Sequence, residues 1–343
     1  MKILIVSNTT IPVQAYGGKD RIVWWLGKEL HKMGHEVSFL VNKASQCSFG
    51  TVLPFNDKKT IAAQIPESVD LVHLHLPAGE VPLEKPYLTT YHENAAKPTV
   101  FDQNTVFLSR NHAQRHGGTV YVYNGLDFDD YGSPSMDNRR MYFHFLGKAA
   151  WTVKNVRGAI DITRMAGERL HVIGGNRINF RMGMNMLSPH VRFHGMLGGD
   201  GKNALIQASK GLIFPSIWHE PFGLAIIESL FFGCPVFGTP YGSLPELLGS
   251  RAAGQRQGNG VIEAFHSEFG FLSIKKSEIA EALKDADHYD RRRCHDYVTA
   301  HFSARHMAAQ YVKLYEQVLN GAVLHEQAPE IKEIPETKLL TLE

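Results

Sequence analysis

Apolar residues in the first part of the chain alternate between short continuous runs and a longer segment with helical spacing. Residues 3–6 and 37–41 are β-branched or apolar runs, typical of buried parallel strands. Between them, apolar residues recur every three or four positions over residues 19–33, which predicts a helix that ends at Gly34. Strand, helix and strand in this order predict a βαβ unit with a right-handed crossover.

Short β-rich runs continue this rhythm between turn residues. In the first part of the chain they cover residues 70–75, 86–91, 105–108 and 119–123. Asn124-Gly125 and a polar stretch interrupt the pattern, and it restarts at Tyr142. Later strands are predicted at 142–147, 170–175, 191–195, 211–214 and 235–238, and helices at 203–208, 224–232 and 303–319. The pattern therefore predicts two doubly wound α/β domains.

The interruption also predicts the domain boundaries. We expect a Rossmann-like domain over residues 1–125, a hinge over 126–140 and a second Rossmann-like domain over 141–302. A helix over 303–320 follows, and a flexible tail is expected over 321–343, where prolines and glutamates gather. Ligands of such sheets bind at the carboxyl ends of strands, so candidate site residues are expected directly after strands.

Composition narrows the classes of function. A length of 343 residues suits about two domains, and the net charge of +2 disfavours a dedicated nucleic-acid-binding protein. The three cysteines, Cys47, Cys234 and Cys294, are far apart and predict a reducing, cytoplasmic compartment rather than disulfides or a metal site. No run of 18 apolar residues occurs, so no transmembrane helix is expected, while peripheral contact with a membrane stays open.

The most specific motif follows the predicted strand at 211–214. Glu220 and Glu228 are separated by seven residues, and Gly223 opens the predicted helix between them. The N–H groups and the positive dipole end of a helix N-terminus suit a phosphate or sugar hydroxyls. Glu220 in the loop can reach a polyol, and Glu228 in the helix can accept both hydroxyls of a ribose. Two glutamates at this spacing also occur by chance, but the motifs around them favour a functional role.

Together these motifs resemble the retaining glycosyltransferase family 4, the group 1 glycosyltransferases, which has the GT-B fold. The matching segments are the E-x7-E block from Glu220 to Glu228, Asn124-Gly-Leu-Asp127, Phe145-Leu-Gly-Lys148 with Lys154, Pro235-Val, and Gly242-Ser-Leu-Pro-Glu246. The resemblance extends to about residue 320. It implies two Rossmann-like domains that face each other across a cleft, with a C-terminal helix that crosses back to the first domain.

Two residues depart from the family pattern. Lys148 stands where the family has an arginine, and Asn155 stands where it has a glycine after the lysine. Lysine is a point charge whereas arginine binds two oxygens at once, so Lys148 would hold a phosphate less rigidly. With Lys154 it is expected to neutralise the charge that grows on a departing nucleoside diphosphate. Outside this pattern, both lysines would be interpreted as solvated surface residues.

Candidate site residues of the first domain are Gly17, Gly18 and His92. The glycines lie between the first strand and its helix, where the backbone can approach a ligand, and the resemblance implies contact with the donor phosphate. The loop is not G-x-G-x-x-G, which disfavours a nicotinamide site. His92 follows a predicted strand, and the resemblance implies that it faces the donor sugar. The chain has 18 histidines, most of which are expected to be structural.

The resemblance implies a retaining hexosyltransferase that moves a sugar from a nucleotide-sugar to a glycan or lipid-linked acceptor, in surface polysaccharide or lipopolysaccharide synthesis. A UDP-sugar is favoured as the donor, with GDP-mannose second. The expected catalytic residues are His92, Lys148, Lys154 and Glu220, and the expected donor-binding residues are Gly17, Gly18, Phe222, Gly223, Leu224 and Glu228. No cofactor and no metal are expected, since the histidines lack metal-binding spacing and no D-x-D motif follows a strand.

Two further functions stay open. One is a nucleotide-sugar 2-epimerase of the same fold, which needs no acceptor. The other is a non-catalytic subunit that binds a sugar nucleotide. The oligomeric state also stays open. Basic residues near Trp24 and Trp25 on the first helix would suit an anionic membrane surface or an ordinary solvated helix face.

Overall fold

The computed structural model describes residues 1–13, 17–77, 83–176, 188–249, 264–333 and 339–343. The chain divides into two units. Unit 1 comprises Met1–Asp127 and Phe302–Ile334, and unit 2 comprises Phe128–His301 and Pro335–Glu343. The chain therefore passes between the units three times, so neither unit is a single continuous stretch of sequence.

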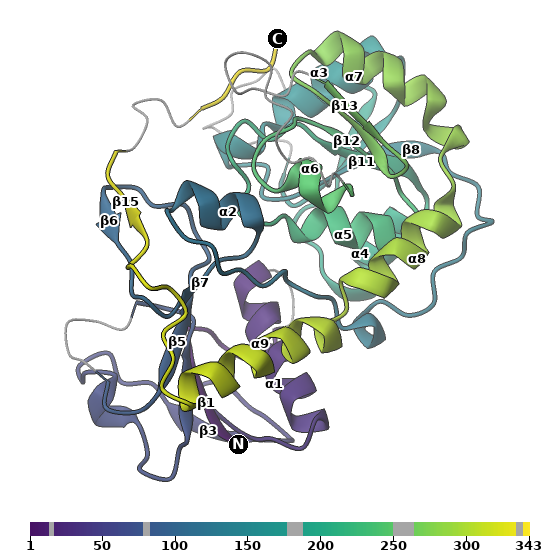
Figure 1. Ribbon diagram of the computed structural model, residues 1–343. Coiled ribbons are helices and arrows are strands. Elements are labelled where there is room, and N and C mark those ends of the chain that lie inside the picture. Colours follow the sequence, from purple (N-terminus) through teal and green to yellow (C-terminus); the bar gives the residue numbers. More distant parts are fainter. Residues whose placement is uncertain (14–16, 78–82, 177–187, 250–263, 334–338) are drawn as a thin grey trace. The chain divides into compact units, whose positions relative to one another are not determined.

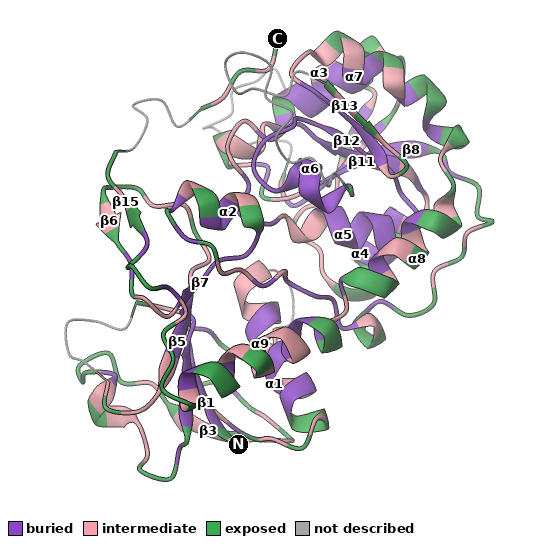
Figure 2. Ribbon diagram, in the orientation of Figure 1, coloured by how far each residue is buried: buried purple, intermediate pink, exposed green. Residues whose placement is uncertain are grey.

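Unit 1 is built on a six-stranded parallel sheet with the order β3-β2-β1-β4-β5-β7 (Figure 1). Its strands are β1 Lys2–Val6, β2 Glu36–Val41, β3 Thr51–Pro54, β4 Leu71–Leu74, β5 Tyr87–Thr90 and β7 Thr105–Val106. β1 and β4 are buried almost throughout, as expected for strands with both faces covered (Figure 2). The direction of the strand order reverses between β1 and β4, which makes their carboxyl ends the topological switch point of this sheet.

Helices from both ends of the sequence cover this sheet. α1 Gly18–Lys32 connects β1 to β2 and buries Trp25, Leu26 and Leu30. α9 Ala304–Leu319 packs beside α1 and β5 (Figure 1), and Ser303 caps it by accepting the His306 N–H at 3.0 Å. The prediction that a helix near residues 303–320 returns to the first domain is therefore confirmed. The other described elements of this unit that precede α9 are η1 Ala62–Gln64, β6 Thr99–Val100 and α2 Arg110–Arg115.

Part of the predicted flexible tail is ordered on unit 1. β15 Glu330–Ile331 pairs antiparallel with β6, and His325 is buried. The His325 Nε2 atom accepts the N–H groups of Thr119 and Val120 at 3.1 and 3.3 Å. These bonds occupy backbone groups that a strand over 119–123 would use for its sheet neighbours. The predicted strand there is therefore wrong, and one isolated bridge between Phe107 and Tyr121 stands in its place.

Unit 2 is built on a seven-stranded sheet with the order β10-β9-β8-β11-β12-β14-β13, in which β13 is antiparallel. Its strands are β8 Tyr142–Leu146, β9 Leu170–Ile173, β10 Val191–Phe193, β11 Ser209–Phe214, β12 Val236–Gly238, β13 Ala264–Ser267 and β14 Gly270–Ser273. Its helices are η2 Phe128–Asp130, η3 Thr152–Lys154, α3 Val156–Met165, α4 Gly199–Gln207, α5 Leu224–Phe231, α6 Leu244–Leu247, α7 Lys276–Ala282, η5 Leu283–His288 and α8 Arg291–His301. The switch point of this sheet lies between β8 and β11.

Two segments of unit 1 that adjoin unit 2 in the sequence lie side by side, one ending at Asp127 and the other beginning at Phe302. The Leu126 N–H donates to the Phe302 carbonyl at 2.8 Å, and the Ala304 N–H donates to the Leu126 carbonyl at 2.7 Å. A Cβ atom on Gly125 would lie 2.2 Å from the Ser303 carbonyl oxygen, so only glycine fits at this close approach. This contact gives a structural reason for the Asn-Gly pair in the motif that begins at Asn124.

The segment predicted as a hinge, 126–140, is divided between the two units. Asp127 stays with unit 1, where its carboxylate accepts a hydrogen bond from Lys28 at 2.5 Å. Phe128 belongs to unit 2, where its ring stacks on Phe231 with the centroids 5.0 Å apart. No helix in the described ranges is long and apolar enough to cross a bilayer.

Candidate active site

The loop between β11 and α5 carries Glu220 at the carboxyl edge of the unit 2 sheet. Glu220 forms an isolated parallel bridge with Gly242, and the Ser243 N–H donates to the Glu220 carbonyl at 3.0 Å. Gly242 has a φ of +68°, and a Cβ atom there would lie 2.2 Å from the Glu220 nitrogen. A second loop therefore fixes the backbone of Glu220, and this fixation requires glycine at position 242.

Lys154 and Glu220 form a close ion pair. The Lys154 Nζ atom lies 2.8 Å from Oε1 and 2.6 Å from Oε2 of Glu220, and the two side chains are 11% and 8% exposed. The Trp218 indole N–H donates to the Glu220 Oε2 atom at 2.8 Å. The ammonium also lies 5.4 Å and 5.3 Å from the ring centroids of Phe214 and Trp218. Two aromatic faces and a carboxylate thus hold the cation in a place with little water.

The backbone conformation of Asn155 explains why asparagine can stand where the family has a glycine. It has a φ of +53° and a ψ of +52°, a left-handed conformation that glycine adopts easily and that asparagine tolerates better than most residues. Its side chain also caps α3, because Oδ1 accepts the Gly158 N–H at 3.0 Å, and Nδ2 donates to the Pro215 carbonyl at 3.1 Å. Asparagine therefore keeps the backbone shape required after Lys154 and joins the two loops of the site.

The N-terminus of α5 is partly exposed beside Glu220. Gly223 precedes the helix with a φ of +92°, and no side chain of the described residues caps the first turn. Gly223, Leu224 and Ala225 are partly exposed, whereas Phe222 is buried and its carbonyl accepts the Ser243 hydroxyl at 2.5 Å. The partly exposed first turn presents backbone N–H groups and a positive dipole end, which suit a phosphate or a sugar hydroxyl.

Glu228 is buried in the second turn of α5. Its Oε1 atom accepts the Tyr131 hydroxyl at 2.7 Å and pairs with the Lys202 ammonium. The same ammonium lies 4.8 Å from the ring centroid of Tyr131. These partners come from α4 and from the segment after η2, so three separate parts of unit 2 meet at one carboxylate.

Lys148 lies in the loop after β8, as Lys154 does, but its environment is different. It is exposed, and its ammonium lies 5.1 Å from the ring centroid of Trp151, which is itself exposed. The Trp151 N–H donates to the Lys148 carbonyl at 2.9 Å, which folds the loop into a turn. Unit 2 therefore holds one of the two predicted phosphate-binding lysines in a fixed ion pair and leaves the other facing solvent.

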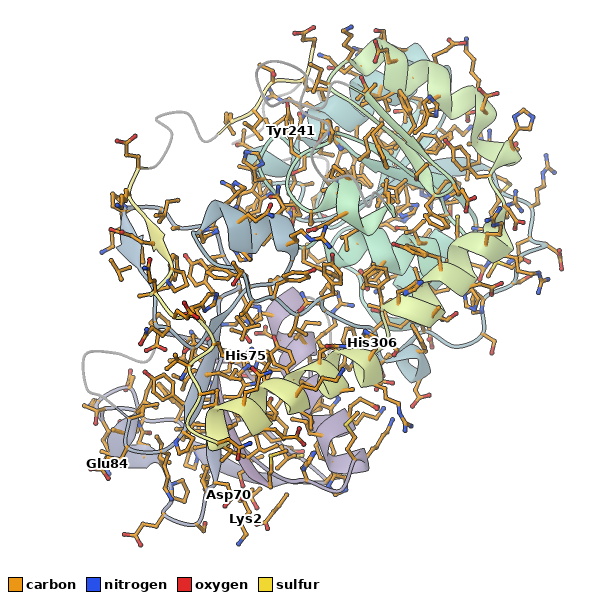
Figure 3. All side chains as sticks on the ribbon, in the orientation of Figure 1. Lys2, Asp70, His75, Glu84, Tyr241 and His306 are labelled. Carbon is orange, nitrogen blue, oxygen red and sulfur yellow. The ribbon has the colours of Figure 1, made fainter. Side chains whose placement is uncertain are left out.

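In unit 1, His92 lies at the carboxyl edge of the sheet and contacts a second histidine. The His92 Nε2 atom lies 2.8 Å from the Nδ1 atom of His75, which follows β4 and is labelled in Figure 3. His73 packs on His75 with the ring centroids 4.2 Å apart. Burial lowers the pKa of all three histidines well below the usual value, and a neighbouring histidine lowers it further. A neutral His92 can exchange hydrogen bonds with a ligand without adding charge.

Gly17 and Gly18 mark the beginning of α1. Gly18 is the first helical residue, and no side chain of the described residues caps this first turn. A Cβ atom on Gly17 would lie 2.6 Å from the Asp20 carboxylate. Lys19 donates to Asn8 Oδ1 at 2.8 Å, which ties the helix to the segment after β1.

Sequence reasoning missed three residues that contact the predicted glutamates. Trp218 lies two residues before Glu220, so an indole N–H next to the motif was a usable local signal. Tyr131 and Lys202 lie 97 and 26 residues from Glu228 along the chain, and no local pattern predicts that they meet it. Within the described ranges, no group of three or more His, Cys, Asp or Glu side chains is placed to hold a metal ion.

Solved structures of glycosyltransferases share this fold. AviGT4, a glycosyltransferase involved in avilamycin A biosynthesis, is 20% identical with a TM-score of 0.73, over 94% of this chain and 99% of that chain. Sucrose-phosphate synthase from Thermosynechococcus elongatus is 16% identical with a TM-score of 0.69, over 94% and 100%. HepE from Anabaena, in complex with UDP and glucose, is 14% identical with a TM-score of 0.63, over 92% and 99%. The two-unit architecture is therefore the GT-B fold, as the sequence predicts.

A family match within unit 2 identifies the family of that segment. Residues 141–287 match the model of the family Glycosyl transferases group 1, so this segment is a domain of that family. The matched segment contains the Lys154–Glu220 pair and Glu228, and the resemblance seen in the sequence is confirmed for it. A comparison with curated proteins gives no match.

Proposed function

We propose that the protein is a retaining glycosyltransferase that moves a sugar from a nucleotide-sugar to a hydroxyl group of a glycan or lipid-linked acceptor. The observation that carries this proposal is the Lys154–Glu220 pair beside the partly exposed N-terminus of α5. A cation, a carboxylate and backbone N–H groups within one short region match the junction between the diphosphate and the sugar of such a donor. The group 1 family match over residues 141–287 supports the same reaction class.

Each predicted site residue of unit 2 has a role in this proposal. Lys154 and the solvent-facing Lys148 neutralise the negative charge that grows on the diphosphate as the glycosidic bond breaks. Glu220 and the backbone of Phe222, Gly223 and Leu224 bind the sugar hydroxyls. Glu228 accepts the ribose hydroxyls, with Lys202 and Tyr131 holding its carboxylate in place.

Retention places the acceptor hydroxyl on the same face of the sugar as the departing diphosphate. The acceptor oxygen forms the new bond to the anomeric carbon while the bond to the diphosphate breaks, and a diphosphate oxygen takes the hydroxyl proton. We include no covalent sugar–enzyme intermediate, because Lys154 and Trp218 already engage both carboxylate oxygens of Glu220. Within unit 1, the proposal gives His92 the role of a neutral hydrogen-bonding group and gives Gly17 and Gly18 the role of letting a ligand approach the backbone closely.

A UDP-sugar is the proposed donor, with GDP-mannose as the second choice. The related fold of HepE has been solved with UDP-glucose, whereas that of starch synthase IV from Arabidopsis thaliana has been solved with ADP and acarbose. Two lysines supply the positive charge at the diphosphate, so the proposed reaction needs no metal ion. The proposed acceptor is a surface polysaccharide or lipopolysaccharide precursor at the cytoplasmic face of a membrane.

Nucleotide binding is tested first, by thermal unfolding with UDP, GDP, ADP and CMP. A ligand that binds only the folded protein raises the Tm by mass action. We expect one nucleotide to raise the Tm of the wild type and of Glu168→Gln, and to have no effect on Glu228→Gln. Glu168 is a matched control because it also pairs with a lysine in unit 2, Lys210, but lies outside the motif. An equal shift in all three proteins would show that Glu228 does not bind the nucleotide.

Turnover is tested with the donor that the first experiment identifies. We expect release of the nucleoside diphosphate only when an acceptor is present, and a product whose anomeric proton has the configuration of the donor by NMR. Release without an acceptor would indicate an epimerase, and binding without turnover on any acceptor would indicate a non-catalytic subunit. A product of opposite configuration would contradict the retaining mechanism.

A further inference from the structure

Residues 339–343 form an extended segment on unit 2, although the sequence predicts a flexible tail there. Leu340 and Leu342 are half-buried, and the residues between and beside them are exposed, which is the period of two of a strand. Leu342 packs against the apolar core on one face of the unit 2 sheet. The segment is therefore attached to the domain by side chains on one of its faces.

Main-chain hydrogen bonds fix the same segment. The Glu343 N–H donates to the Ile274 carbonyl at 2.8 Å, and the Lys276 N–H donates to the Glu343 carbonyl at 2.7 Å. These two bonds join the segment to the residue after β14 and to the first residue of α7. Leu342 and this pair of bonds anchor one end of the segment to the core of unit 2.

The other end of the segment contacts the two loops that hold Glu220. The Leu340 N–H donates to the Ile217 carbonyl at 2.7 Å, and Ile217 lies next to Trp218 in the β11–α5 loop. The Tyr241 hydroxyl donates to the Thr341 carbonyl at 2.7 Å. Tyr241, labelled in Figure 3, precedes Gly242, whose backbone bridges to Glu220.

Ile217 also connects this contact to Lys154. Its N–H donates to the Val153 carbonyl at 2.9 Å, and the Ser216 hydroxyl donates to the same carbonyl at 3.2 Å. One residue therefore receives a bond from the segment through its carbonyl and gives a bond to the β8–α3 loop through its N–H. The segment, the Glu220 loop and the Lys154 loop form one continuous chain of hydrogen bonds.

We propose that residues 339–343 are a positioning segment for the Lys154–Glu220 pair and so set how well the enzyme recognises the sugar of its donor. Within the described ranges the segment forms no hydrogen bond or ion pair with Lys154 or Glu220, and it acts by fixing Ile217 and Tyr241. Glu228 has partners from other parts of unit 2, so recognition of the ribose does not depend on this segment. The inference rests on the proposed function for the identity of the ligand, but not for the geometry of the loop.

The geometry is tested without any ligand through the indole N–H of Trp218, which reports the hydrogen bond to Glu220. The chain has 4 tryptophans, and the Trp218→Phe variant assigns the Trp218 signal in a ¹⁵N–¹H NMR spectrum. We expect deletion of residues 339–343 to move this signal and to leave the other indole signals in place. An unchanged Trp218 signal in the deletion variant would overturn the proposal.

Milder variants cover the case in which the deletion destabilises the fold. Leu340→Pro removes the N–H that bonds to Ile217, and Tyr241→Phe removes the hydroxyl that bonds to Thr341. Leu339→Pro is the matched control, because Leu339 is 48% exposed and donates no hydrogen bond within the described part of the chain. We expect Leu340→Pro and Tyr241→Phe to move the Trp218 signal and Leu339→Pro to leave it unchanged. Equal effects of the two proline variants would overturn the proposal.

Binding measurements distinguish recognition of the sugar from recognition of the rest of the donor. In Leu340→Pro we expect the Kd for the nucleoside monophosphate, which lacks the phosphate beside Lys154, to stay within about twofold of the wild type, and the Kd for the intact nucleotide-sugar to rise about tenfold. Equal losses for both ligands would show that the segment only stabilises the domain, which overturns the inference. If the wild type binds no nucleotide, the proposed function fails, and the Trp218 signal still decides whether the segment positions the loop.

Discussion

The Lys154 Nζ atom lies within 2.8 Å of both carboxylate oxygens of Glu220, a residue 66 positions further along the chain. The two side chains follow β8 and β11, which are neighbours in the sheet. Connections leave these two parallel strands in opposite directions, so their carboxyl ends border an open crevice at the switch point. The sheet topology therefore brings together a cation and a carboxylate that the sequence separates widely.

A double-mutant cycle measures how strongly the pair is coupled. Both side chains are largely buried, so removing one partner leaves an unpaired charge, and we expect Lys154→Met or Glu220→Gln to lower the free energy of unfolding by about 3 kcal/mol. The double variant leaves no buried charge and should lose less than the sum of the two single effects. Urea denaturation measures all four proteins. Strictly additive losses would mean that the two side chains act independently.

Two variants of Asn155 separate its left-handed backbone conformation from its side-chain cap of α3. Asn155→Gly keeps the left-handed backbone accessible but loses the cap of α3, and Asn155→Ala loses the cap and adds backbone strain. We therefore expect Asn155→Ala to cost more stability than Asn155→Gly, by about 1 kcal/mol. Thermal unfolding of the two variants beside the wild type gives the order. If the alanine variant were the more stable one, the left-handed conformation would not matter at this position.

Gly242→Ala tests the close approach of the two loops at Glu220. The new Cβ atom would meet the Glu220 backbone nitrogen at 2.2 Å, so we expect the loop to shift and both stability and activity to fall. Gly167→Ala is a suitable control, because Gly167 has a similar φ of +70° and a Cβ atom there would meet no other part of the described chain within 4 Å. Both variants carry the cost of backbone strain, about 1 kcal/mol. Only the Gly242 variant should lose activity beyond that, measured as kcat/KM.

His144 should make unit 2 sensitive to acid. It is fully buried on β8, where its ring nitrogens contact the hydroxyls of Ser209 and Ser229 at 2.7 and 2.9 Å. Burial, and next the charge of Arg140, lowers the pKa of His144 to about 3, whereas the unfolded chain has a histidine pKa near 6.5. Between these values the unfolded state binds the extra proton. The stabilising effect is therefore complete above pH 6.5 and is lost as the pH falls.

Comparison with His144→Gln isolates this effect. The wild type should lose up to about 1.4 kcal/mol of unfolding free energy per pH unit below pH 6.5 that the variant does not lose. Urea denaturation at pH 7.5, 6 and 5 measures the difference between the two proteins. A difference that stays constant over this range would mean that His144 is protonated in the folded protein as readily as in the unfolded chain.

The local patterns in the sequence predicted most strands of the two large sheets. Runs such as residues 3–6 and 142–147 are buried on both faces, so hydrophobic content alone locates them within one or two residues. Glu220 was predicted because its motif combines a strand end with the beginning of a helix, and both are local features. The helical spacing in α3 is equally local, yet that helix is absent from the predicted elements.

The partners of those residues could not be predicted in the same way. Which lysine meets Glu228 depends on how α4 packs beside α5, and no short segment contains that information. The contacts of the tail could not be predicted for the same reason. Residues 339–343 are held by hydrogen bonds to carbonyl groups at Ile217 and Ile274, and any extended segment can make such bonds. The composition of residues 339–343 does not indicate which surface of the protein they bind.

The return of α9 to unit 1 has a consequence for protein synthesis. Within unit 1, His73 and Thr90 bond to the hydroxyls of Tyr315 and Tyr311, both on α9. A ribosome that adds 5–20 residues each second needs roughly 10 to 40 seconds to go from Thr90 to the start of that helix. During this interval the nascent sheet has no partner for a buried face. The early chain segments therefore cannot complete this face of the sheet until α9 has been synthesised.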